Sequence, residues 1–336
     1  MKRAPKLVFA LLAAVVCVLL FVLLLMRGDS GAFPPLPSPN GYDDFITAGN
    51  FLSGQTNDAY EMDVEQLRAF VAANRESLRL LQLGLTRTCS VHTVEFLTNN
   101  PALASDAMAT KRLAQFEAAV GRLAELEGRT NDAVTAYLTG MRFGNEASRG
   151  GFVIHRLVGI ACEVIARSRL GPVATNLSAA DTRRVIRALE KLESDTVSWE
   201  EIDGSERMYM RGAIRQFNNP ILLVQSWWSA RSMLKKARIR HLGEIARRRL
   251  LIVELALRCR ASEHGSPPQQ LNDLVPEYLA RVPLDPFTDQ ELIYRTAGTN
   301  WSLYSVGANY VDDGGAPATR ASGGKPPGGD LRFDSR

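Results

Sequence analysis

The sequence has few histidines and lacks the short motifs that mark common enzyme sites. The histidines stand far apart and show no metal-ligand spacing; they are His92, His155, His241 and His264. No HExxH or GxSxG motif occurs, and SGGKPP lacks the earlier glycine and the Ser or Thr of a phosphate-binding loop. These absences favour a protein without catalytic activity. The alternative is an envelope enzyme whose site is assembled in the helical middle of the chain from residues that no motif marks.

Cysteines are also few, and no two of them form a CxxC pair. They are Cys17, Cys89, Cys162 and Cys259, and Cys17 lies within a long apolar run. The remaining three are an odd number, which argues against a disulfide framework. We therefore expect buried, unpaired thiols.

Charge of one sign is not in large excess. The 336 residues carry 40 Lys and Arg against 36 Asp and Glu, which gives a formal net charge of +4. A nucleic-acid-binding domain is usually far more basic, so we expect no nucleic-acid partner. With 46% hydrophobic residues the chain can bury a sizeable core, and its length suggests more than one folded unit.

A long uncharged run stands near the beginning of the sequence. Residues 7–26 read LVFALLAAVVCVLLFVLLLM, and as a helix they would span roughly 30 Å, the thickness of a bilayer's hydrocarbon core. Three basic residues within 1–6 precede the run and favour a cytoplasmic N-terminus. The run therefore predicts a single-pass transmembrane helix with the bulk of the chain in the periplasm. A cleaved signal peptide, with SGA at 30–32 as its cleavage site, is the alternative.

Proline and glycine in residues 27–42 predict a linker, and residues 43–243 show helical periodicity, which predicts a helical bundle. One helix is expected over residues 64–85. Two further helices, joined by a short turn at residues 128–130, predict a hairpin. Within it, residues 121–140 resemble one tetratricopeptide unit. Such repeats normally need about three copies to bury a continuous core, so an ordinary helical hairpin is the alternative.

A basic helical segment follows at residues 230–250, ARSMLKKARIRHLGEIARRRL. It carries eight Lys or Arg residues against one acid, Glu244. Such a segment either binds anionic lipid headgroups or an acidic partner, or it forms a solvated helix face. Trp227 and Trp228, just before it, are either interfacial anchors or a buried pair.

The periodicity changes from helical to strand-like in the last part of the chain. A helix is expected to end at Gly265, with two prolines beyond it. Strands are expected at residues 291–295 and 301–306, and residues 330–334 can add a third. Residues 244–336 are therefore predicted to form a small α+β domain in a chain that is otherwise mostly α-helical.

The order of features in residues 245–336 resembles the C-terminal domain of the type II secretion major pseudopilin. The matching residues, in PLDPF, a tyrosine strand and LYSVG, are Pro283, Asp285, Pro286, Phe287, Tyr294, Leu303, Tyr304, Ser305 and Gly307. GGDLRF at 328–333 looks like the strand that closes that family's calcium loop. The full layout also resembles a group of uncharacterised, membrane-anchored envelope proteins of planctomycete-type bacteria.

The resemblance implies a long helix with a small antiparallel sheet, a protein partner in a secretion-related or other assembly, and a place at the bacterial inner membrane. Unlike a pseudopilin, the chain has no glutamate within its apolar run, and residues 27–243 separate that run from the module. We therefore expect the module without the usual filament assembly. The sequence predicts a non-catalytic, membrane-anchored envelope protein that acts through protein–protein contact.

The resemblance also implies calcium at the loop after LYSVG. Asp312 and Asp313 lie in VDDGG, and Asp330 returns to the same neighbourhood if the last strand joins the sheet. Calcium prefers about six to eight oxygen ligands, although the spacing here is not that of an EF-hand. Three like charges in one loop need either a cation or well-placed backbone N–H groups. A calcium site at these three residues and a plain polar turn are the two interpretations, whereas Asp285 is expected to fix a turn.

Overall fold

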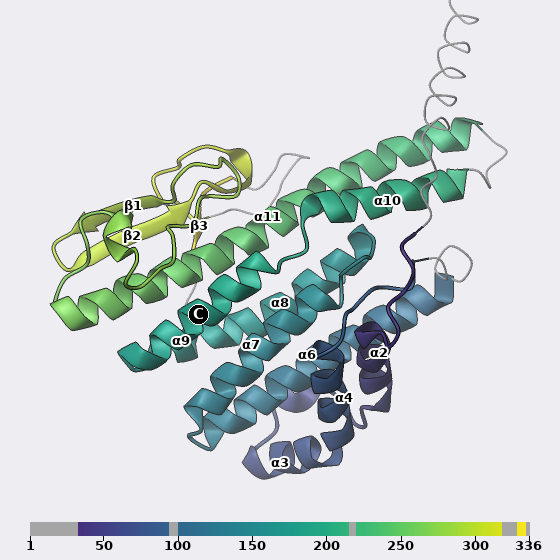
Figure 1. The fold of residues 1–336 in the computed structure, drawn as a ribbon, viewed down its shortest axis with the longest axis horizontal. Helices are drawn as coiled ribbons and strands as arrows, with labels where there is room; N and C mark the ends of the chain where they lie inside the picture. The colour runs from purple at the N-terminus through teal and green to yellow at the C-terminus, as the bar shows by residue number, and fades with distance from the viewer. Residues whose placement is uncertain (1–32, 94–99, 215–219, 318–327, 334–336) are drawn as a thin grey trace, which may run out of the picture.

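The computed structural model describes residues 33–93, 100–214, 220–317 and 328–333 (Figure 1). The predicted cytoplasmic tail and transmembrane run lie outside these residues, as do the side chains of Trp227 and Trp228. Within the described ranges, no helix is both long and apolar enough to cross a bilayer.

The described chain is mostly helical and ends in a small three-stranded antiparallel sheet, as the sequence predicts. Its helices are, in chain order, α2 (Gly41–Phe51), η1 (Asn57–Tyr60), α3 (Val64–Ala73), α4 (Arg75–Leu85), α6 (Asn100–Leu126), α7 (Thr130–Glu146), α8 (Val153–Ala174), α9 (Ala179–Ser194), α10 (Trp199–Ile214), α11 (Pro220–His264), η2 (Leu271–Leu274) and η3 (Gly307–Asn309). Its strands are β1 (Ile293–Ala297), β2 (Asn300–Ser305) and β3 (Leu331–Arg332).

The single helix predicted over residues 64–85 is broken into α3 and α4. Asn74, at the break, is buried and has non-helical backbone angles (φ −108°, ψ 23°). Its side chain accepts a hydrogen bond from the Ser53 N–H (2.8 Å) and donates one to the Phe70 carbonyl (2.9 Å). A short polar side chain that bonds to backbone groups in this way competes with the helical ladder. The tertiary contact to Ser53 is not visible in a local pattern.

Helices α6, α7 and α8 pack closely against one another, and α6 with α7 forms the predicted hairpin. Small residues make the close approach possible. A Cβ atom on Gly144 of α7 would lie 2.6 Å from the Gly159 carbonyl of α8, and one on Gly159 would lie 2.3 Å from the Gly144 carbonyl. Real side chains do not fit at such distances, so the two glycines let the helix backbones touch.

Helix α11 is a single helix of 45 residues that runs along the whole body, with α10 beside one end and the sheet on the other (Figure 1). The domain boundary predicted between residues 243 and 244 therefore falls inside this helix. One apolar core also joins both sides of that position, because it includes Tyr137 and Ile186 of the helical region, Leu251 of α11 and Leu303 of β2. Independent folding of residues 244–336 stays a prediction.

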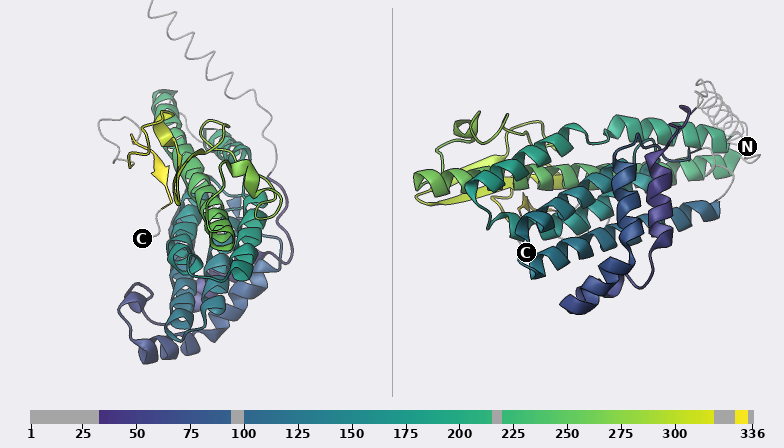
Figure 2. Two further views of the ribbon diagram at one scale, coloured as in Figure 1. Left: turned by 90° about the vertical axis from the view of Figure 1, so that its left-hand side faces the viewer. Right: turned by 60° about the horizontal axis from the view of Figure 1, so that its bottom comes forward.

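The sheet has the order β1-β2-β3 and packs on the C-terminal half of α11. Tyr294 pairs with Leu303 across β1 and β2, and Tyr304 pairs with Arg332 across β2 and β3. All three strands arise where the alternating pattern predicts them, and their ends shift by one or two residues. In the turned views the sheet and the early helices α2–α4 lie on opposite sides of the body (Figure 2). We call residues 265–317 and 328–333 the C-terminal module.

Candidate functional site

The predicted calcium residues do come together in one loop of the C-terminal module. Asp312 and Asp313 follow η3, and Asp330 returns beside them because β3 pairs with β2. The Asp330 N–H donates to the Ala316 carbonyl at 2.7 Å, which closes the loop onto its own end. The sequence thus predicted the meeting of these acids correctly.

The Asp330 and Asp313 carboxylates each accept backbone hydrogen bonds. Asp330 is buried and accepts from the N–H groups of Gly315 (2.6 Å) and Asp313 (3.3 Å). The Asp313 side chain accepts from the Asn309 amide (2.7 Å) and the Gly329 N–H (2.9 Å). Gly315 has φ +81°, a left-handed conformation that favours glycine and that turns its N–H toward Asp330.

Asp312 is held by three further donors. Its carboxylate accepts from the Gly314 N–H (2.8 Å), the Tyr304 hydroxyl (2.9 Å) and the Arg295 guanidinium (3.0 Å). The Gly314 N–H and then the Tyr304 hydroxyl hold the pKa of Asp312 below its usual range, so it is ionised at neutral pH. N–H and O–H donors therefore stabilise the negative charges of the loop. A bound cation would have to compete with these donors for the carboxylate oxygens. Calcium binding at Asp312, Asp313 and Asp330 stays a prediction.

Asp285 has the turn-fixing role that the sequence predicts. It is buried, and its carboxylate accepts from the Phe287 N–H (3.0 Å) and from the Val306 N–H (2.9 Å). The first bond shapes the PLDPF turn, and the second ties that turn to the end of β2. Asp285 thereby connects the two sequence segments that carry the pseudopilin resemblance.

A second acidic group, which the sequence analysis missed, lies at the end of α11. Glu263, His264 and Glu277 place one potential ligand atom each within 4.8 Å of one another, and all three are exposed. Arg183 of α9 pairs with Glu263 (2.6 Å) and Glu277 (3.4 Å). Its guanidinium, followed by the Tyr278 hydroxyl, lowers the pKa of Glu263. The positive charge that these carboxylates attract is thus supplied by the protein itself.

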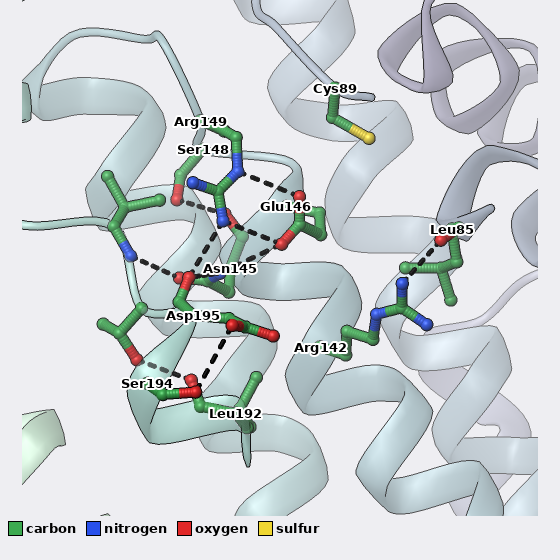
Figure 3. A network of polar contacts seen from close by, with 12 residues as sticks. Leu85, Cys89, Arg142, Asn145, Glu146, Ser148, Arg149, Leu192, Ser194 and Asp195 are labelled. Carbon is green, nitrogen blue, oxygen red and sulfur yellow. Dashed lines mark hydrogen bonds and ion pairs between the residues drawn. The ribbon is translucent and has the colours of Figure 1, made fainter. Parts of the chain in front are cut away.

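Two adjoining hollows lie along α7 and α9, with volumes of about 430 and 480 Å³. Glu146 and Asp195 line both of them (Figure 3). Arg149 pairs with Glu146 at 2.9 Å, Lys191 pairs with Asp195 at 2.9 Å, and Arg142 donates to the Leu85 carbonyl at 2.6 Å. These charged groups therefore hold one another and the backbone, and Figure 3 shows the contacts of Arg149 with Glu146 and of Arg142 with Leu85.

Cys89, labelled in Figure 3, is one of the residues that line the hollow of about 480 Å³. Burial raises the pKa of its thiol to about 12, with a smaller contribution from Glu146. The thiolate is the reactive form of cysteine, so this thiol is inert at neutral pH. Cys89, Cys162 and Cys259 are free and buried, as the sequence analysis expected.

A buried chain of ion pairs joins α8, α9 and α11, and the sequence analysis missed it. Glu163 of α8 binds Arg156 (2.6 Å) and contacts Arg248 of α11 (3.4 Å). Arg248 and its neighbour Arg249 both reach Glu193 of α9, at 2.8 and 2.7 Å. The Arg156, Glu163 and Arg248 side chains are at most 1% exposed.

Glu244, the one acid of the basic segment, takes part in a neighbouring buried pair. Its carboxylate accepts from Arg167 of α8 at 2.7 Å. His241, one turn earlier, accepts a hydrogen bond from Arg156 (3.1 Å), and burial followed by that positive charge lowers its pKa to about 3. The inner side of the basic segment is therefore neither a lipid patch nor a solvated face. It is a polar seam that joins α11 to α8 and α9.

Comparisons with family models, with curated proteins and with solved structures found no match to this chain. The pseudopilin resemblance of residues 245–336 stays a prediction.

Proposed function

We propose that this chain is a non-catalytic, membrane-anchored envelope protein whose helical body holds the pseudopilin-like C-terminal module in a fixed position for a protein partner. The observation that carries the proposal is the continuity of α11. Its first half packs on α8 and α10, and its second half supports the sheet. No loop intervenes between the two halves, so a movement of the module must move the helix with it.

The buried seam supports rigid attachment. Arg248 is fully buried, and its partners Glu163 and Glu193 come from two different helices. Removing one member of a buried ion pair leaves an uncompensated charge and typically destabilises a protein by about 3–5 kcal/mol. The seam therefore favours one arrangement of α11 against the body. A protein that positions a module for a partner requires such a fixed arrangement.

The module has an exposed apolar tip that fits a contact role. Tyr310 and Val311 are 57% and 53% exposed. Tyr310 has φ +61°, a left-handed conformation that is unusual for a bulky residue. Such backbone strain is concentrated at functional sites. Tyr is also enriched among the interface residues that contribute most of the binding energy. The Tyr310 ring rests edge-on against Phe287, with 5.9 Å between ring centroids, so the tip is supported from below.

The enzyme alternative finds less support among the described contacts. The charged groups along the α7–α9 hollows hold one another or the backbone, and the Cys89 thiol is neutral. A cysteine nucleophile needs a depressed pKa or an adjacent base, whereas burial raises the pKa of the Cys89 thiol. The apolar run at residues 7–26 supports the anchor, and the resemblance of residues 245–336 supports a partner in a secretion-related assembly.

The test is photo-crosslinking in intact cells, with a photoreactive amino acid in place of Val311. We expect a discrete crosslinked species in the membrane fraction. The control carries the same amino acid in place of Arg187, which is exposed on α9, and we expect no such species from it. Equal crosslinking from both positions, or a chain that stays in the soluble fraction, would contradict the proposal.

A further inference from the structure

We infer that α11 carries a second contact surface, a basic face that binds the anionic headgroups of the bilayer in which the protein is anchored. This basic face consists of Lys235, Lys236, Arg238 and Arg240. The inference rests on the membrane anchor of the proposed function and extends it, because it says how the body lies on the membrane.

The charged side chains in the surrounding sequence are all positive. Residues 207–243 contain eight Lys or Arg residues and no Asp or Glu. Clusters of four to eight such residues on an amphipathic helix are typical of segments that bind anionic lipids. A net charge of +4 for the whole chain means that this concentration is local.

The four basic residues occupy the exposed half of this part of α11, with Arg238 and Arg240 at its two edges, about 160° apart around the helix. Successive residues of an α-helix are turned by about 100°, so Ala237, His241 and Glu244 share one side of α11. That side is buried against the other helices, whereas all four residues of the basic face are exposed. Met233 is 44% exposed beside them, and an apolar residue within a basic face is common on helices that lie at a membrane surface.

Ion pairing separates this face from the rest of α11. The arginines of the buried seam, including Arg248 and Arg249, are paired with carboxylates from other helices. By contrast, across the described ranges, no carboxylate lies within ion-pair distance of Lys235, Lys236, Arg238 or Arg240. Four adjacent positive charges repel one another, and that repulsion is relieved when an outside anionic surface is present.

The described chain begins against α8 and α10, and α10 packs beside α11. The Phe33 ring contacts Phe152 at 6.1 Å between centroids, and both pack with Tyr209 of α10, the helix that lies beside α11. Residues 27–32 connect Phe33 to the predicted transmembrane run, and six residues span at most about 20 Å. An anchored protein therefore has the α10–α11 end of its body close to the bilayer, which is why we choose a lipid surface over an acidic protein.

The test uses the full chain reconstituted into two kinds of vesicle, one of phosphatidylcholine alone and one that also contains phosphatidylglycerol. Lysine acetylation is followed by mass spectrometry, and the rates at Lys235 and Lys236 are compared with the rate at Lys191, which is exposed on α9. We expect acetylation of Lys235 and Lys236 to slow by about fivefold or more in the anionic vesicles, with no change at Lys191. Added salt should remove the protection.

Two matched variants separate the face from total charge. Arg238→Glu with Arg240→Glu keeps both reporter lysines and should abolish their protection. Arg75→Glu with Arg187→Glu changes the net charge equally on exposed positions of α4 and α9, and should leave the protection intact. Protection lost equally in both variants would overturn the inference.

Vesicle flotation distinguishes failure of the inference from failure of the anchor. A chain that floats with both kinds of vesicle, but whose Lys235 and Lys236 react equally in both, is anchored without using the basic face and overturns the inference alone. A chain that floats with neither contradicts the anchor and the proposed function with it. Protection that appears only when an acidic protein is added would assign the face to that protein instead.

Discussion

Glu117 of α6 is the least expected ionisable residue of the helical core. Its side chain is 2% exposed, and its Oε2 has no hydrogen-bond partner among the described residues. Burial raises the pKa of this carboxyl from 4.5 to about 8, so Glu117 is neutral in the folded protein at neutral pH. The helical periodicity places the residue on α6 but does not reveal its burial, because glutamate is usually exposed.

The raised pKa makes stability depend on pH. The folded state holds a proton that the unfolded state releases, so the free energy of unfolding falls as the pH rises between about 4.5 and about 8, and the loss is complete above that window. Glu117→Gln should therefore have a larger free energy of unfolding than the natural protein. The difference should be small at pH 5 and about 2–5 kcal/mol at pH 8.5. Thermal unfolding at both pH values measures it, and Glu200→Gln, an exposed change, is the control. A gap independent of pH would contradict the account.

Asp330 supports a second prediction at the residue scale, and it separates the two interpretations of the VDDGG loop. Its buried carboxylate holds two backbone N–H groups, so Asp330→Ala should lower the melting temperature even in the presence of a chelator. The calcium prediction adds a rise of a few degrees for the natural protein with calcium but not with magnesium. Identical melting with calcium, magnesium and chelator would leave the loop as a polar turn closed by hydrogen bonds.

The helices and strands differ in how well the sequence predicts them. The helix end at Gly265 and the strands after it carry local signals, namely a glycine with φ +77° and alternating apolar residues, and both are found. The break at Asn74 depends on a contact with Ser53, and the buried seam depends on which arginines meet carboxylates of distant helices. A run of arginines looks the same in a sequence whether its members are buried or exposed. The hydrogen-bond donors of the VDDGG loop were foreseen only as one of two possibilities.

The seam gives the prediction at the scale of the helices. Arg248→Met leaves the buried carboxylate of Glu163 and the half-buried one of Glu193 without this partner, and we expect it to destabilise the protein by about 3–5 kcal/mol. Chemical denaturation measures the loss. Arg79→Met removes an exposed pair with Glu76 on α4 and should leave the denaturation midpoint almost unchanged. Equal effects of the two substitutions would show that the seam does not hold α11 in place.

At the scale of the whole molecule, the long helix α11 crosses the domain boundary that the sequence predicts at residue 244. The change of periodicity near residue 244 falls inside α11, where the helix begins to pack against the C-terminal module, and one apolar core includes residues on both sides of it. Independent folding of residues 244–336 stays a prediction. The exposed side of the same helix carries the basic face. The helical body, the C-terminal module and the proposed lipid-binding residues are thus all placed by α11. The exposed residues Tyr310 and Val311 follow η3, which packs with Ile239, Leu242 and Ala246 near the middle of this helix.

The fixed position of the module is best measured as a distance in the full chain. Spin labels carried on unnatural amino acids at Arg187 of α9 and at Thr299, in the turn between β1 and β2, report the body and the module, and both positions are exposed. Pulsed electron resonance should give one narrow distance distribution, the same in detergent and in vesicles. A broad distribution, or two separate distances, would mean that the module moves relative to the helical body and would contradict the account.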